Sequence, residues 1–366
     1  MFLISKPMIE VTLENLNSAI RPKEVFGKLS GDSETMLEQA KSVYRQMAKA
    51  THEDKFSESE KPQAKKAFQR LQELWALCQE EIKTGRYDTE DVVVITAGKN
   101  EYKIIGKAIS GDLCNIYNCE SKHGKAFLKI SKKVLLNHFL VNEAGVLKKL
   151  HSTKEVGLKG LFDSHVPVCL DSFAVDSMQA NVVSTYLNLH TLEQVRQVHL
   201  QGVDSRTLAW MFRRLLAALG AAHEREIVHG AVVPTNFLVC PDDHNGFLID
   251  WCCAVDSGKV VKAISPQWKA FYPPEILSKK EVTPTADIYM AAMLMLYVSG
   301  GDVEKRKFPE RMPKRIEFFL RACLIESPAS RANYALDLHK EFGDLLEELY
   351  GKPKFHPFEM PTNGKL

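Results

Sequence analysis

Three polar residues in the second half of the chain have side chains of the kinds that handle metal ions and phosphate groups. His229 and Asn236 stand in the apolar stretch VHGAVVPTNFLV, and Asp250 ends the apolar run FLI that follows. An amide oxygen and a carboxylate are hard ligands of the kind that Mg²⁺ prefers. Phosphoryl transfer also needs a carboxylate that accepts the proton of the attacking hydroxyl, and none stands between His229 and Asn236. The segment therefore keeps candidate metal ligands without the proton acceptor.

Two residues earlier in the chain suit the same chemistry. Lys129 ends the strand-like run AFLK and offers a cation for phosphate, and Glu143 opens the helical pattern EAGVLKKL. Because Lys129 and Glu143 come in this order before the segment from His229 to Asp250, the sequence resembles the protein kinase family. Lys129 falls at the lysine of the family's V-A-I-K strand, and Glu143 falls at the glutamate of the αC helix that pairs with this lysine. The resemblance implies that the pair is retained.

The catalytic segments of the family have counterparts in the same chain order. His229, Ala231 and Asn236 fall at the His, Asp and Asn of the catalytic loop H-R-D-x-x-x-x-N. Asp250 falls at the metal-binding aspartate of D-F-G, so that Asn236 and Asp250 are the implied Mg²⁺ ligands. The resemblance thus implies a nucleotide site for ATP made by Gly111, Lys129, Glu143, Leu187, Asn236 and Asp250.

The departures from the family bear on catalysis. No catalytic residue is predicted, because alanine at 231 can neither accept a proton nor orient a nucleophile. Gly230 replaces the arginine, Asp-Trp-Cys replaces Asp-Phe-Gly, and Gly111 alone remains of the glycine-rich loop. An inefficient or inactive kinase is therefore expected. In the plainer alternative, Lys129 and Glu143 only hold the small lobe together and Asp250 is only a polar strand end.

Three later residues resemble structural positions of the family. Glu275, after Pro274, is similar to the glutamate of A-P-E, and Asp287 opens the apolar helix that anchors the catalytic loop. Arg331 stands where the family places the arginine that pairs with the A-P-E glutamate. These residues are expected to support the fold and to take no part in the chemistry.

The first ninety residues have a different pattern. Apolar residues with helical spacing predict amphipathic helices at 33–50 and 61–83, packed as a pair. The segment YRQMAKATHEDKF resembles the end of helix II and the following loop of a J-domain, the DnaJ module that stimulates DnaK-type chaperones, with His-Glu-Asp in place of His-Pro-Asp. The resemblance implies a partner-binding surface made by Lys41, Arg45, Lys49, His52 and Asp54. In the alternative, these are solvated surface residues.

Composition excludes several other classes. A formal charge of +2 gives no field that would draw the chain to nucleic acid or to an anionic membrane. The 8 cysteines include no C-x-x-C pair and are expected to be reduced thiols. There is no secretion-signal pattern and no run of apolar residues long enough to span a bilayer, which predicts a cytoplasmic protein.

The predicted fold class is α+β, with an N-terminal all-α J-like helical domain followed by a bilobal protein-kinase-like fold. The predicted boundaries give a J-like domain at 1–90, a β-rich N-lobe at 91–187, an α-rich C-lobe at 188–348 and an extended C-terminal arm at 349–366. The expected function is a pseudokinase adaptor that recruits a DnaK-type chaperone or another protein partner. The alternatives are a slow, atypical serine/threonine protein kinase and a scaffold that is independent of nucleotide.

Overall fold

The computed structural model describes residues 16, 19, 21–52, 56–57, 61–85, 87, 93–122, 124–152, 165–185 and 189–360. The chain divides into two compact units, 1–132 and 133–366. In the described part of the chain, no helix is long and apolar enough to cross a membrane. The domain boundaries proposed from the sequence remain predictions.

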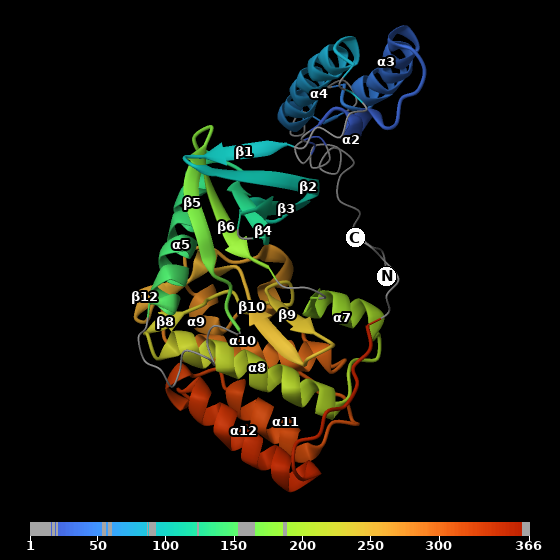
Figure 1. Cartoon of the computed structure of the whole chain (residues 1–366). Coiled ribbons are helices and arrows are strands. Elements are labelled where there is room, and N and C mark those ends of the chain that lie inside the picture. The colour runs from blue at the N-terminus through green and yellow to red at the C-terminus, as the bar shows by residue number, and fades with distance from the viewer. Residues whose placement is uncertain are drawn as a thin grey trace. The chain divides into compact units, whose positions relative to one another are not determined.

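Two helices dominate the N-terminal part of the first unit. After the single turn α2 (Lys23–Phe26), helix α3 spans Ser33–Ala50 and helix α4 spans Lys61–Lys83, as the spacing of apolar residues predicts. Asp32 begins α3, because its carboxylate accepts a hydrogen bond of 2.8 Å from the backbone N–H of Thr35. Helices α3 and α4 lie side by side (Figure 1).

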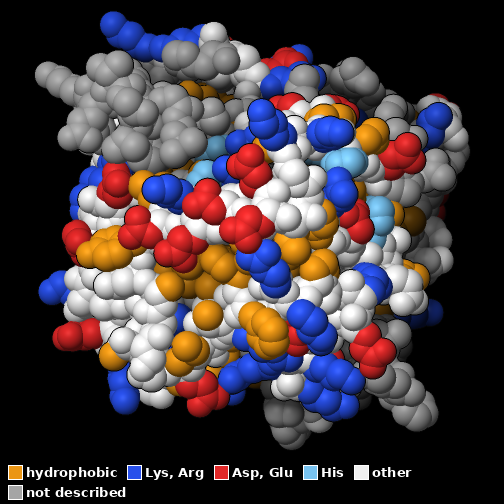
Figure 2. Space-filling view, turned by 90° about the horizontal axis from the view of Figure 1, so that it is seen from below, with side chains coloured by type: hydrophobic (Ala, Val, Ile, Leu, Met, Phe, Trp, Pro, Cys, Tyr) orange, Lys and Arg blue, Asp and Glu red, His pale blue; other side chains and the backbone are white. Residues whose placement is uncertain are grey.

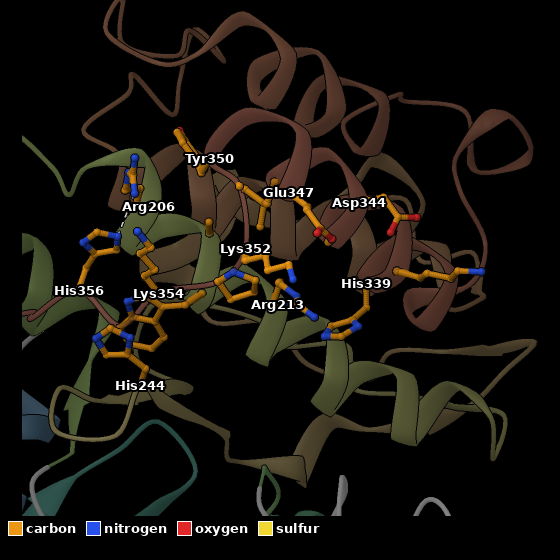
Figure 3. A pocket seen from close by; sticks show the side chains of 17 residues that line it. Arg206, Arg213, His244, His339, Asp344, Glu347, Tyr350, Lys352, Lys354 and His356 are labelled. Carbon is orange, nitrogen blue, oxygen red and sulfur yellow. Dashed lines mark hydrogen bonds between the residues drawn. The ribbon is translucent and has the colours of Figure 1, made fainter.

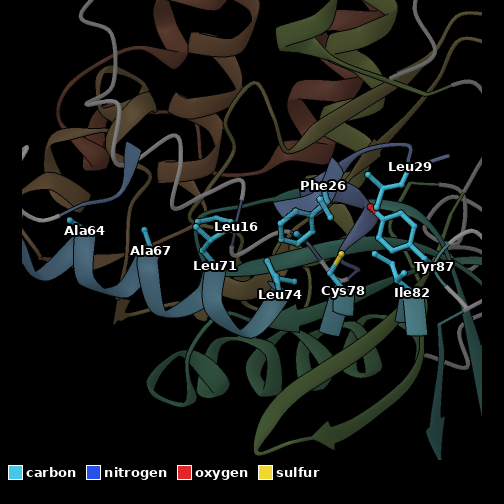
Figure 4. Close-up of a cluster of buried hydrophobic side chains, with 12 residues drawn as sticks. Leu16, Phe26, Leu29, Ala64, Ala67, Leu71, Leu74, Cys78, Ile82 and Tyr87 are labelled. Carbon is cyan, nitrogen blue, oxygen red and sulfur yellow. The ribbon is translucent and has the colours of Figure 1, made fainter. Parts of the chain in front are cut away.

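The apolar faces of these helices share one core. Tyr44 of α3 stacks on Trp75 of α4 with ring centroids 5.1 Å apart, and the hydroxyl of Tyr87 donates a 2.8 Å hydrogen bond to the carbonyl of Gly27. The fully buried side chains repeat along α4 every three or four residues, which confirms the predicted apolar face. The buried set, drawn in Figure 4, is Leu16, Ala19, Phe26, Leu29, Ala40, Ala64, Ala67, Leu71, Leu74, Cys78, Ile82 and Tyr87.

Four antiparallel strands complete the first unit. They are β1 (Val94–Ala97), β2 (Asn100–Ser110), β3 (Cys114–Ser121) and β4 (Gly124–Ser131), each paired with the next. The β2–β3 pairing shifts register between Ile105 and Ile109, so β2 bends there. Strand β4 carries Lys129, whose register partner on β3 is Ile116.

The second unit opens with a helix and a hairpin. Helix α5 (Asn137–His151) follows the short 3₁₀ turn η2 (Val134–Leu136), and strands β5 (Cys169–Val175) and β6 (Met178–Ser184) pair antiparallel. Asn181 of β6 is completely buried and donates a 2.7 Å hydrogen bond from its amide to the carbonyl of Leu140. This bond fixes α5 against the hairpin.

The rest of the second unit is mainly helical. Helix α10 is apolar on every side and nearly all of its residues are buried, so it forms the centre of this part. The helices are α7 (Leu192–Val198), α8 (Ser205–His223), α9 (Pro274–Leu277), α10 (Thr285–Val298), α11 (Lys314–Cys323) and α12 (Ala335–Tyr350). The short strands are β7 (His190–Thr191), β8 (Ile227–Val228), β9 (Phe237–Cys240), β10 (Asn245–Leu248), β11 (Val255–Asp256), β12 (Lys259–Val260) and β13 (Glu281–Val282). The further 3₁₀ turns are η3 (Trp251–Cys253), η4 (Pro266–Phe271) and η5 (Pro328–Ser330).

A buried ion pair joins two distant segments of this unit, as the sequence predicts. Nη1 of Arg331 lies 2.7 Å from a carboxylate oxygen of Glu275, and both side chains are almost wholly removed from solvent. The guanidinium also donates to the backbone carbonyls of Thr285, Ile325 and Glu326. One side chain therefore ties α9, the start of α10 and the loop after α11 together.

The segment after Gly351 runs as an extended arm over the second unit. Phe358 is 8% exposed and stacks on His199, with ring centroids 5.1 Å apart. Phe355 stacks on His244 at 4.2 Å, and Nη1 of Arg206 donates to the ring of His356 at 2.9 Å. From residue 351 to residue 360 the chain has no helix or strand, and it docks on the helical part of the second unit.

Candidate functional site

Asp287 fixes the loop between β8 and β9. It lies in the first turn of α10, is completely buried, and accepts hydrogen bonds from the backbone N–H groups of His229 (2.7 Å) and Gly230 (2.9 Å). The ring of His223 lies 3.0 Å from the same carboxylate. Gly230 has φ of 70°, and a Cβ there would come within 2.8 Å of the Val261 side chain. The glycine is therefore required by this loop.

Ala231 occupies the centre of the loop and is 6% exposed. Its backbone N–H donates to Nδ1 of His229 at 3.2 Å, and its carbonyl accepts a 3.0 Å hydrogen bond from the Asn236 amide. The hydroxyl of Thr235 donates to the amide oxygen of Asn236 at 3.3 Å. The loop is thus held in one conformation around a methyl group, which has no capacity to accept a proton.

Trp251, directly after Asp250, packs into the core below the loop. It is fully buried, its indole N–H donates a 2.9 Å hydrogen bond to the carbonyl of Leu248, and its ring meets His229 edge-on at 4.5 Å. The second ring nitrogen of His229 lies 3.1 Å from the carbonyl of Ile249. The tryptophan at this position therefore supports the loop from behind and has its polar atom satisfied.

Asp250 follows β10 in an unusual backbone conformation. Its φ and ψ are both 64°, in the left-handed region that costs a non-glycine residue energy and that clusters at functional sites. The carboxylates of Asp250 and Glu143 and the thiol of Cys252 bring one ligand atom each to within 4.8 Å of one another. The second unit thus brings two of the predicted site residues together with a cysteine that the sequence did not single out.

The oxygen atoms among these donors are suitable ligands for a nucleotide-bound Mg²⁺. Asp250 offers a carboxylate oxygen and Asn236 offers a side-chain amide oxygen. The two residues are connected because Ile249, next to Asp250, donates its backbone N–H to the backbone carbonyl of Asn236 at 2.9 Å. Hard cations take such oxygens and leave thiols to softer metals, so Cys252 is outside the expected set. Glu143, 2% exposed, accepts a 3.1 Å hydrogen bond from the Asn181 amide, which orients its carboxylate.

Two predicted site residues belong to the first unit. Lys129 is 4% exposed on β4. Gly111 sits in the tight turn between β2 and β3, where its N–H donates to the carbonyl of Cys114 at 3.0 Å and a Cβ would lie 3.1 Å from that oxygen. Ile109, just before this turn, is 58% exposed. Leu187, the remaining predicted nucleotide contact, lies outside the described residues.

Three of the predicted partner-binding residues lie on helix α3 of the first unit. Arg45 and Lys49 are exposed on α3, and Lys41 is half-buried with its amine 3.2 Å from the Glu38 carboxylate. Their spacing of four places them on one face of the helix. His52 is exposed shortly after the helix ends, and Asp54 lies outside the described residues.

Asn142 is a residue beside the candidate site that the sequence did not single out. Its amide donates to the carbonyls of Cys252 (3.2 Å) and Ala254 (2.8 Å), so it connects α5 to the segment that follows Asp250. It stands one residue before Glu143 and therefore couples the position of that glutamate to the position of Asp250. Contacts of a side chain with distant backbone carbonyls leave no signal in residue type or spacing.

Comparison with known families gives a match that covers more than half of the chain. The protein kinase domain model matches residues 100–349. The match includes every predicted nucleotide-site residue, from Gly111 to Asp250, together with Ala231 and the Glu275–Arg331 pair. A comparison with curated proteins finds no match to this chain.

Proposed function

Because the chain belongs to the protein kinase family, we propose that it is a pseudokinase that binds ATP with Mg²⁺ and acts as an adaptor for a protein partner. The observation that carries the proposal is Ala231. It stands at the place of the catalytic aspartate, in a loop held by Asp287 and Asn236 around a side chain with no proton-accepting atom. Binding and chemistry are therefore separable in this chain.

Each retained residue has a role in binding. Lys129 supplies positive charge for the phosphates, and Glu143, oriented by Asn181, is the partner that the family provides for this lysine. Asn236 and Asp250 supply the oxygen ligands for the metal. When bound, Mg²⁺ neutralises charge on the phosphates. Without an aspartate at 231, the hydroxyl of a substrate is neither oriented nor deprotonated, and general-base removal costs a factor on the order of 10²–10⁴ in rate.

We expect ATP to raise the melting temperature of the purified protein only when Mg²⁺ is present. A ligand that binds only the folded state stabilises it by mass action, by about 2.7 kcal/mol at a hundredfold excess over Kd, which is about 5–10 °C for a domain of this size. Differential scanning fluorimetry measures this shift. It should disappear in Lys129→Met and in Asp250→Ala.

The exposed Lys262 gives a matched control, since Lys262→Gln also removes one positive charge and should leave the shift unchanged. No shift at millimolar ATP would remove nucleotide from the proposed function and leave the nucleotide-independent scaffold. A shift accompanied by slow transfer of the γ-phosphate to protein, lost in Lys129→Met, would instead support the slow, atypical kinase.

The N-terminal helices support a second element of the proposal, the recruitment of a DnaK-type chaperone. Lys41, Arg45 and Lys49 follow one face of α3, and His52 comes directly after the helix, in the order that the J-domain resemblance requires. A positive helix face beside a histidine-containing loop offers charge complementarity to an acidic partner surface. In this proposal the kinase-like domain binds the partner and the helical domain delivers the chaperone.

A steady-state ATPase assay of a DnaK-type chaperone tests this element. The full chain should raise the chaperone's ATPase rate, and His52→Gln and the double variant Arg45→Gln/Lys49→Gln should both abolish the increase. Lys65→Gln/Lys66→Gln on α4 removes the same charge from two exposed positions and should have no effect. Equal rates with and without the parent protein would overturn the chaperone role and leave the nucleotide proposal unaffected.

A further inference from the structure

A pocket of about 500 Å³ lies between helices α8 and α12 and the start of the C-terminal arm. Figure 3 shows its lining, with side chains from all three segments. It is built wholly from residues 206–356, in the second unit, and contains none of the predicted nucleotide-site residues. Pockets for small ligands span about 300–1,000 Å³, so this one can hold a compact metabolite.

The pocket lining is strongly basic. Its cationic side chains outnumber its two carboxylates, Asp344 and Glu347, by three. On the molecular face shown in Figure 2, acidic and basic side chains are interspersed, so the excess in the pocket is a local feature. The cations are Arg206, Arg213, Lys340, Lys352 and Lys354.

Arg213 is the centre of the excess of positive charge in the pocket lining. Its Nε is buried without a hydrogen-bond acceptor among the described residues. No carboxylate in that part of the chain forms an ion pair with it, and Arg214 next to it carries the same charge. Burial and the charge of Arg214 lower the pKa of the Arg213 guanidinium. Arg213 is half-buried, and a partly desolvated cation that forms no ion pair among the described residues is costly, so an anion in the pocket would relieve that cost.

Helix α12 leaves room beside this guanidinium. Gly343 faces Arg213, and a Cβ at this glycine would lie 3.7 Å from the guanidinium carbon. A glycine inside a helix costs about 0.5–1 kcal/mol relative to alanine, and no positive φ requires it here. At this distance a methyl group would only touch the guanidinium, so the glycine leaves the space beside Arg213 unfilled. Trp210 also lines the pocket, and its indole N–H is buried without an acceptor in the described part of the chain.

His339 reports the electrostatic potential of the pocket. Burial, together with the charges of Arg213, Arg214 and His165, lowers its pKa to about 4. A neutral His339 therefore contributes stability that is fully present above about pH 6.5 and is lost as the pH falls towards 4. A bound anion would offset the charge of Arg213 and raise this pKa.

The arm completes the pocket. It brings Lys352 and Lys354 to the rim and is anchored beyond them by the Phe355–His244 stack and by the bond of Arg206 to His356. The volume of about 500 Å³ favours a small ligand over a phosphorylated protein surface. Lysine and arginine together bind phosphate groups through point charge and forked hydrogen bonds.

We propose that the pocket between α8, α12 and the arm binds a small phosphate-bearing metabolite with two or more negative charges. Arg213 and the arm lysines supply the counter-charges. The ligand joins the arm to the helices, so binding also stabilises the docked arm. This site is separate from the predicted nucleotide site and does not depend on it.

Isothermal titration calorimetry with inorganic pyrophosphate, in the absence of Mg²⁺, tests the proposal on the full chain. We expect binding that weakens with salt and that Arg213→Gln weakens by about 10–100-fold, the value of a charged hydrogen bond. Lys352→Gln/Lys354→Gln, at two exposed positions that do not endanger folding, should weaken it by at least about tenfold.

Two controls locate the binding. Lys262→Gln/Lys269→Gln removes two exposed charges elsewhere, and Asp250→Ala alters the predicted nucleotide site, so neither should change the Kd. In NMR titrations, pyrophosphate should raise the pKa of His339 from about 4. Absence of binding at millimolar pyrophosphate, equal Kd values for the arm-lysine variant and its control, or an unmoved His339 would each overturn the proposal.

Discussion

Arg331→Ala should destabilise the protein by about 3–5 kcal/mol, because it leaves the Glu275 carboxylate charged and buried without its partner. The arginine also donates to three backbone carbonyls, of which that of Thr285 is reached by the same nitrogen that binds Glu275. A loss of this size is a large part of the roughly 5–15 kcal/mol that stabilises an ordinary domain. Urea denaturation followed by circular dichroism measures it as a lowered midpoint.

Two further variants separate the ion pair from simple loss of packing. Arg331→Lys keeps the charge without the forked donors and should recover only part of the stability. The exposed pair Arg315–Glu348 has its atoms 2.5 Å apart, yet Arg315→Ala should cost less than about 1 kcal/mol because solvent screens it. Similar losses for Arg331→Ala and Arg315→Ala would show that the buried pair does not hold this part of the fold.

Ala231→Asp should raise phosphoryl transfer from ATP by about 10²-fold over the parent chain, the lower end of what a positioned general base contributes. The surrounding loop is already fixed by Asp287, His229 and Asn236, so the new carboxylate enters an ordered frame. Labelled ATP, with a generic acceptor protein and with the chain itself as substrate, measures the transfer.

Ala231→Asn is the matched control, because asparagine has nearly the same shape as aspartate but lacks a basic carboxylate. This variant should show no gain in phosphoryl transfer. Adding Lys129→Met to Ala231→Asp should remove the gain, since the phosphates then lack their cation. A parent chain that already transfers phosphate as fast as Ala231→Asp would mean that another residue acts as the base, as the atypical-kinase alternative requires.

The sequence predicted well those features that repeat along the chain or form short linear patterns. Helices α3 and α4 have the predicted bounds, because their apolar residues recur with helical spacing and Asp32 begins α3. The Glu275–Arg331 pair followed from the order of the family's motifs.

Features that depend on residues far apart in the chain could not be predicted. The side chains of Asn142 and Asn181 hold α5 in place by hydrogen bonds to backbone carbonyls and to the Glu143 carboxylate. The sequence positions of the two asparagines do not identify these partners. Cys252 comes close to Asp250 and Glu143 only because of the turn after β10. The basic pocket collects charges from three segments whose individual composition is ordinary.

The central claim is that the protein binds ATP without transferring its γ-phosphate. The most direct test follows ATP that is labelled in the γ-phosphate and mixed with excess protein and Mg²⁺. We predict that Asp250→Ala removes binding, whereas the parent retains the nucleotide and releases it intact on addition of a chelator. Ala231→Asp under the same conditions should convert the label into phosphoprotein. A parent chain that binds no labelled ATP, or that transfers the labelled phosphate at the rate of Ala231→Asp, would contradict the claim.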